Sequence, residues 1–160
     1  MNAMNLPDPD TAFSLGNAVA ASGWGVLALS PARAAWAGRA RLYAGRVVPL
    51  ALAIAYVLLV ARHWGPGGFG SLAAVRELFS EPGLLAAGWL HYLAFDLFVG
   101  AWIAERAAAL GWPHLVVLPL LALTFLFGPA GLLAFSLVRA AALRHGARTT
   151  LPVSLQEIRS

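Results

Sequence analysis

Long apolar runs constrain this chain more than any other feature of its sequence. A helix needs about 20 residues to cross a hydrocarbon layer of roughly 30 Å at 1.5 Å per residue. Runs of this kind lie at 13–29, 42–61, 84–104 and 115–138. Backbone groups in lipid must bond to one another, and these runs are too long and continuous for barrel strands. The sequence therefore predicts an all-α integral membrane protein, a four-transmembrane-helix bundle in a single domain over 1–160.

The composition agrees with this class and disfavours others. Hydrophobic residues make up 60% of the chain and charged residues 11%, whereas soluble domains average about 45–50% apolar and about 25% charged. The arginines stand at the edges of the apolar runs and not on one polar face, so we expect membrane lipid and no nucleic acid as a partner. The absence of cysteine excludes disulfides, thiolate metal sites and cysteine nucleophiles. The first ten residues are acidic, unlike the start of a secretory signal, so the first run is expected to remain as a span.

The segment between the second and third runs predicts a short helix at the membrane interface. Glycine and proline dominate 65–70, which is typical of a turn. Apolar residues then recur at near-helical spacing through 72–79, and Pro82 stops the pattern.

Arginine placement gives a mixed prediction for orientation. The loop after the first run holds four arginines without an acid, at positions Arg33, Arg39, Arg41 and Arg46. Such a loop is expected in the cytoplasm, with the N-terminus outside. The segment after the fourth run is also basic, through Arg139, Arg144, Arg148 and Arg159 against Glu157. Four crossings would place that segment on the opposite side, so either the rule fails here or one run does not fully cross.

The third run carries two ionisable residues, His91 and Asp96. A charge near the centre of a span costs about 2.5–3.5 kcal/mol on insertion scales and by default indicates function. Five residues at 100° each set the two side chains about 140° apart around the helix, so each is expected to meet a partner on another span. The structural alternative is that both bond to backbone carbonyls or to Asn17 and Thr124 and hold the helices in register.

The fourth run contains Pro129, which removes one donor and frees the carbonyl of Phe125, four residues earlier. That carbonyl, beside Thr124, could accept a bond from a ligand, or the proline could simply mark a kink. A metal site is not predicted, because the histidines at 63, 91, 114 and 145 stand singly without helical i, i+3 or i, i+4 pairing. The motifs of serine hydrolases, P-loop nucleotide hydrolases and c-type cytochromes are missing from the sequence.

Three segments carry a family resemblance. They are GWLHYLAFDLFVG at 88–100, LTFLFGPAGLL at 123–133, and the approach from Gly70-Ser71-Leu72 to Leu78-Phe79-Ser80. Together they resemble the abscisic-acid-deficient-four-like family, which includes a plant protein needed to convert violaxanthin to neoxanthin and bacterial relatives, and which is also catalogued as a domain of unknown function. The resemblance implies a four-helix membrane protein and a bacterial inner membrane, cytoplasmic or intracytoplasmic.

The resemblance also implies a set of shared positions. These are Asn17, Trp89, His91, Tyr92, Asp96, Gly100, Thr124, Gly128, Pro129 and Gly131. The chain departs from the pattern at Ala101, where many relatives have an arginine, which weakens the idea of a charge pair with Asp96.

Two functions follow as expectations. The first is a carotenoid or isoprenoid isomerase, with Asp96 and His91 as catalytic acid and base. Its substrate-binding residues would be Asn17, Trp89, Tyr92, Trp102, Thr124 and Phe125. A bound carotenoid or isoprenoid lipid is the expected ligand, with no metal. The alternative is a non-catalytic accessory subunit or pigment-binding protein, with other membrane proteins as partners. A proton path through Asp96 finds less support, because few ionisable residues line up beyond it.

Overall fold

The computed structural model describes residues 7–149, and side chains as far as residue 144. All regular structure in this range is helical, with no strand, which confirms the predicted all-α class. The elements are α1 (Pro9–Ala28), α2 (Ala37–Leu42), the π-helical turn η1 (Tyr43–Val47), α3 (Val48–His63), α4 (Leu72–Leu78), α5 (Pro82–Ala109), α6 (His114–Phe127) and α7 (Pro129–Thr149). The predicted contributions of residues 157 and 159 to the basic tail lie outside the described residues, as do the side chains of residues 145 and 148.

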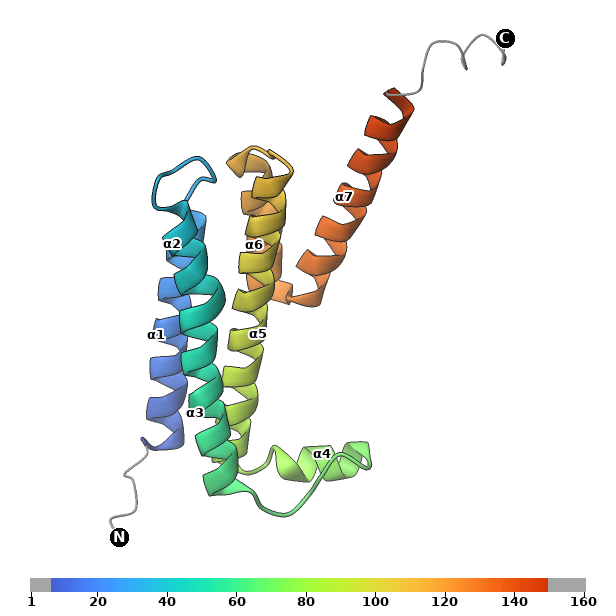
Figure 1. Cartoon of the computed structure of the whole chain (residues 1–160). Helices are drawn as coiled ribbons and strands as arrows, with labels where there is room; N and C mark the ends of the chain where they lie inside the picture. Colours follow the sequence, from blue (N-terminus) through green and yellow to red (C-terminus); the bar gives the residue numbers. More distant parts are fainter. Residues whose placement is uncertain (1–6, 150–160) are drawn as a thin grey trace.

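Helix α5 is the centre of the bundle. It packs against α1, α3 and α6, and it buries residues along its whole length. Figure 1 shows α1, α3 and α5 running side by side. Small residues let these helices approach closely: the indole of Trp24 occupies the space where a Cβ on Gly100 would lie.

Two helices are long and apolar enough to cross a membrane. One is the continuous helix Ala37–His63, of 27 residues, and the other is Pro82–Ala109, of 28 residues. They correspond to the second and third predicted runs. Helix α1 covers the first run with 20 residues.

The turn η1 has a local cause in Pro49. Without an N–H, Pro49 cannot bond to the carbonyl of Gly45, four residues earlier. The guanidinium of Arg46 donates to that carbonyl instead, at 3.3 Å. The helix therefore passes through a π-helical turn without breaking.

The fourth run, 115–138, is not the single helix that the sequence predicts. Helix α6 ends at Phe127, and α7 starts at Pro129 after Gly128, whose φ is +26°. Figure 1 shows that α7 turns back toward the end of the bundle where α6 begins. Phe135 on α7 packs edge-on against Trp102 and Trp112, with ring centroids 5.4 and 5.6 Å apart. The 14 residues of α6 span only about 21 Å, so the run forms a helical hairpin in place of one long span.

The two ends of the bundle have different contacts. At the end that holds the 29–36 loop, which we call the arginine end, His114 is 2.8 Å from the carbonyl of Ala28. At the other end, the α4 end, His63 forms an ion pair with Glu81 at 3.1 Å. Helix α4 confirms the short helix predicted between the second and third runs, and the hydroxyl of Ser71 caps it.

Candidate functional site

Asp96 lies in the middle of α5 and faces the turn of the α6–α7 hairpin. Its side chain is only 8% exposed, and its Oδ2 atom has no hydrogen-bond partner in the part of the chain that the structure describes. A Cβ on Gly128 would lie 2.9 Å from Cγ of Asp96. The carboxyl group therefore sits directly against the backbone between α6 and α7.

The local sequence explains why the chain turns there. Gly128 adopts a positive φ, which residues with a Cβ rarely take. Pro129 suits the first position of a helix because no intrahelical partner exists for its missing N–H. The amides of Gly131 and Leu132 donate to the carbonyl of Gly128 and start α7. Thr124 is fully buried beside Gly131 and donates its hydroxyl to the carbonyl of Leu120 at 2.8 Å.

A row of polar and aromatic side chains leads away from Asp96 along α5. Tyr92, one turn earlier, directs its hydroxyl to the carbonyl of Leu126 at 3.5 Å, a long contact at the limit for a hydrogen bond. The ring of Tyr92 lies 5.2 Å from that of Trp89. The indole N–H of Trp89 donates to Oδ1 of Asn17 on α1 at 3.0 Å. The structure thus brings together four of the predicted site residues, and it adds the carbonyl of Leu126.

Two helix ends of opposite polarity meet at this carboxyl group. The C-terminus of α6 presents carbonyl oxygens, such as that of Leu126, which accept from proton donors. The N-terminus of α7 carries the positive end of its helix dipole, although Pro129 has no N–H and the amides of Gly131 and Leu132 are bonded to the carbonyl of Gly128. Broken helices of this kind form polar binding sites at membrane depth. A carboxyl group with one unpaired oxygen can therefore donate a proton to a ligand oxygen or accept one from it.

His91 lies on a different face of α5, as its helical angle from Asp96 predicts. Its side chain is exposed and stacks on Phe95 at 4.6 Å, with the ring of Tyr56 5.5 Å away. The structure therefore does not bring His91 and Asp96 together. Tyr56, which sequence reasoning did not select, is the aromatic neighbour of His91 on α3.

Two other predicted binding residues take part in packing. Trp102 contacts Phe135 on α7, and the guanidinium of Arg106 lies 5.8 Å from its ring. Phe125 packs edge-on against Trp24 at 5.4 Å. Both help to hold the hairpin against the bundle, and neither is in contact with Asp96 through a ring or hydrogen bond that the structure shows.

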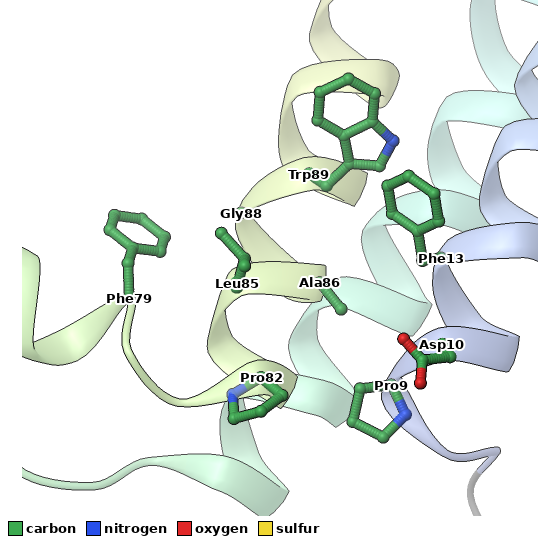
Figure 2. A pocket seen from close by; sticks show the side chains of 9 residues that line it. All are labelled: Pro9, Asp10, Phe13, Phe79, Pro82, Leu85, Ala86, Gly88 and Trp89. Atoms are coloured by element: carbon green, nitrogen blue, oxygen red, sulfur yellow. The ribbon is translucent and has the colours of Figure 1, made fainter.

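A cavity of about 530 Å³ lies away from Asp96, at the α4 end. Figure 2 shows its lining, which comes from the start of α1, the start of α5 and Phe79 after α4. The rings of Phe13 and Trp89 are 5.5 Å apart on one side of it. Trp89 therefore belongs both to this cavity and to the row that leads to Asp96.

Among the side chains as far as residue 144, no three His, Asp or Glu residues are grouped so that they could hold a metal ion. Two of the histidines have partners at opposite ends of the bundle, since His63 pairs with Glu81 and His114 with the carbonyl of Ala28.

Comparison with known families decides the relationship that the three segments suggest. A family model described as ABA DEFICIENT 4-like matches residues 11–135. The chain belongs to this family. The match to the ABA DEFICIENT 4-like family covers Asn17, the middle of α5 and the whole hairpin turn, so it includes every residue of the site. Family membership and the two long apolar helices indicate a membrane protein. Comparison with curated proteins and with solved structures gives no match.

The functional part that sequence reasoning missed is the turn itself. The sequence left open whether Pro129 frees a carbonyl for a ligand or marks a kink, whereas in the structure Gly128 reverses the chain and places the carbonyl of Leu126 near Tyr92. One sequence feature pointed this way, namely the basic character of the segment after the fourth run, which four full crossings leave unexplained.

Proposed function

We propose that this ABA DEFICIENT 4-like protein is a membrane enzyme that isomerises a carotenoid or another long isoprenoid, with Asp96 as the proton-transfer group. The observation that carries the proposal is the buried Oδ2 atom of Asp96 at the hairpin turn, which has no hydrogen-bond partner among the described residues, in a residue that is only 8% exposed. An unpaired polar atom costs free energy in an apolar surrounding, and such atoms in spans are characteristic of functional sites. The nearby aromatic row of Tyr92 and Trp89 suits a long polyene.

The proposed reaction needs no net redox change and no net proton. When a 5,6-epoxide becomes an allenic alcohol, one epoxide C–O bond breaks and the oxygen gains a proton. A vinylic C–H bond also breaks, and its electron pair forms the second double bond of the allene. Asp96 can give the first proton as an acid and take up the second as a carboxylate, which restores its starting state. Because His91 lies on another face, we assign both steps to Asp96. Tyr92, one turn earlier on α5, directs its hydroxyl to the carbonyl of Leu126.

We further propose that three helices cross the membrane and that the α6–α7 hairpin enters it only partway. Helices α1, Ala37–His63 and α5 would be the spans. The hairpin would then return Arg139 and Arg144 to the arginine end, where Arg33 and Arg39 lie. All these basic residues would face the cytoplasm, as the positive-inside rule requires, in a bacterial inner membrane. This arrangement removes the conflict that four crossings create.

A second candidate function is a pigment-binding or accessory subunit of a larger membrane complex. The observation that favours it is the outer surface of α7, where Leu133 and Leu137 are 61% and 62% exposed. Such a surface can contact lipid or the spans of another protein.

The deciding experiment is pigment analysis in a host that makes epoxy-carotenoids. We expect the wild-type chain to produce an isomerised pigment, and Asp96→Asn to lower its formation about 100-fold or more, since acid–base catalysis contributes roughly 10²–10⁴. Glu77→Gln, which changes an exposed acid on α4, is the matched control and should keep full conversion. Full conversion by Asp96→Asn would overturn the catalytic proposal. Purification of wild type with unaltered bound pigment and without conversion would favour the second candidate.

A further inference from the structure

A second cavity lies on the other side of α5, beneath α4. Its volume is about 240 Å³, and α3, the segment around α4, and α5 line it. Half of its lining residues carry aromatic rings, namely Tyr56, Trp64, Phe69, Phe79 and His91. The ring of Trp64 lies 6.2 Å from that of Phe69, and the ring of Tyr56 lies 5.5 Å from that of His91.

His91 and Tyr56 are the polar groups that set this cavity apart. Within the described residues, His91 makes ring contacts only, and the hydroxyl of Tyr56 has no hydrogen bond. His63 and His114, in contrast, each have a polar partner. A ligand that enters the cavity can therefore bond to both His91 and Tyr56 without displacing an existing hydrogen bond.

The chemistry of the cavity selects a class of ligand. Imidazole and phenol both donate to a neutral carbonyl or hydroxyl oxygen. The surrounding rings can stack on a flat or nearly flat ring. No Arg, Asp or Glu lines the cavity, so a phosphate or carboxylate would be buried there without a counter-charge.

We propose that this cavity binds a six-membered ring that carries a carbonyl or hydroxyl oxygen and an isoprenoid chain. Either a quinone or the oxygenated end ring of a carotenoid has this chemistry. The oxygen accepts from His91 and Tyr56, and the ring lies among Trp64, Phe69 and Phe79. The site is separate from Asp96 and its binding does not depend on turnover.

Phe79 and Gly88 connect this site to the larger cavity at the α4 end, since both residues line both spaces. An atom of the Phe79 ring lies 2.6 Å from the position of a Cβ on Gly88, so the ring packs directly on the α5 backbone (Figure 2). The larger cavity offers apolar surface to the chain of a ligand whose ring occupies the smaller one.

Binding can be measured by quenching of tryptophan fluorescence in detergent micelles, because Trp64 lines the cavity. The probes are a short-chain benzoquinone, a dihydroxylated carotenoid, and β-carotene, which has no oxygen. We expect the benzoquinone or the dihydroxylated carotenoid to bind more tightly than β-carotene. Tyr56→Phe and His91→Phe should each weaken that binding about three- to tenfold, the effect of one net hydrogen bond.

The control variant is Tyr43→Phe, whose hydroxyl contacts Ser22 at 2.8 Å. It should bind the probes as the wild type does. His91→Gln keeps a hydrogen-bond donor and should bind more tightly than His91→Phe, which separates hydrogen bonding from loss of fold. The oxygenated probe whose affinity falls in Tyr56→Phe and His91→Phe identifies the source of the ring. Equal affinity for β-carotene, no binding of either oxygenated probe, or affinities unchanged in both variants would overturn the proposal. None of these outcomes depends on catalysis at Asp96.

Discussion

The α-carbon of Gly128 faces the carboxyl group of Asp96 so closely that a Cβ at residue 128 would lie 2.9 Å from Cγ of Asp96. Gly128 forms the turn that ends α6, and Asp96 lies in the middle of the 28-residue helix α5. This contact fixes where along α5 the hairpin reverses. It also brings the C-terminus of α6 and the N-terminus of α7 to Asp96, whose carboxyl group is buried.

Gly128→Ala should destabilise the protein by about 1–3 kcal/mol. The added methyl group would collide with Asp96, and the positive φ of residue 128 is strained for any residue with a Cβ. The change in stability can be measured by unfolding the protein in mixed micelles with an increasing fraction of denaturing detergent. Gly25→Ala is the matched control, because a Cβ at residue 25 on α1 meets nothing within 4 Å. It should be neutral or stabilise by roughly 0.5–1 kcal/mol. Equal stability of the two variants would mean that the Gly128 contact does not hold the hairpin.

The hydrogen bond from Trp89 to Asn17 should couple α1 to α5. A double-mutant cycle with Asn17→Ala and Trp89→Phe is expected to give a coupling free energy of about 0.6 kcal/mol, with an upper bound of about 1.7 kcal/mol. The same unfolding assay applies. Asn17→Ala combined with Trp36→Phe is the control cycle, since Trp36 is exposed in the loop beyond α1. A control coupling as large as that of Asn17 with Trp89 would contradict a specific bond.

Much of this fold could be predicted from hydropathy and spacing alone. The second and third runs are long apolar helices, and Pro82 does separate the short helix α4 from α5. The helical angle between His91 and Asp96 also predicted that they would meet different neighbours. These features depend on local sequence, so they can be predicted from a single sequence.

The hairpin could not be predicted in the same way, because proline in a helix is compatible with a kink, a stop or a reversal. The reversal depends on the positive φ of Gly128 and on its tertiary contact with Asp96, and neither is visible in the hydropathy of the run. The cavity beneath α4 has the same origin. It exists because Phe79 folds back onto Gly88, which sequence spacing does not specify.

Lowering the pH should loosen the first turn of α1 through Asp8. The side chain and amide of Thr11 donate to the carboxyl group at 2.7 and 3.0 Å, and these bonds lower the pKa of Asp8 from its ordinary value of 3.8. Because the folded pKa is the lower one, the cap stabilises the helix above pH 3.8 and is lost as the pH falls through the folded pKa.

The shift of the Thr11 amide resonance during an acid titration measures this pKa directly. Its midpoint should lie below 3.8 in the wild type and rise toward 3.8 in Thr11→Ala, which lacks the side-chain donor. Asp10→Asn is the control, since Asp10 does not cap the helix, and it should leave the midpoint nearly unchanged. A wild-type midpoint at or above 3.8 would mean that the hydrogen bonds from Thr11 do not lower the pKa of Asp8.

The partial insertion of the α6–α7 hairpin makes a distinct prediction about sidedness. The chain has no cysteine, so single cysteines can be labelled without background. Suitable positions are Gly38 at the arginine end, Gly70 at the α4 end and Leu143 on α7, which are all exposed. A Cβ at Gly38 or Gly70 meets nothing within 4 Å, so the substitutions should be tolerated.

Labelling with a membrane-impermeant maleimide on oriented vesicles should place Gly38→Cys and Leu143→Cys on the same side, with Gly70→Cys on the other. Three crossings and a returning hairpin require this pattern, whereas four full crossings would place Leu143→Cys with Gly70→Cys. The arginines of α7 favour the first outcome, because it gathers them with Arg33 and Arg39 on one face of the membrane.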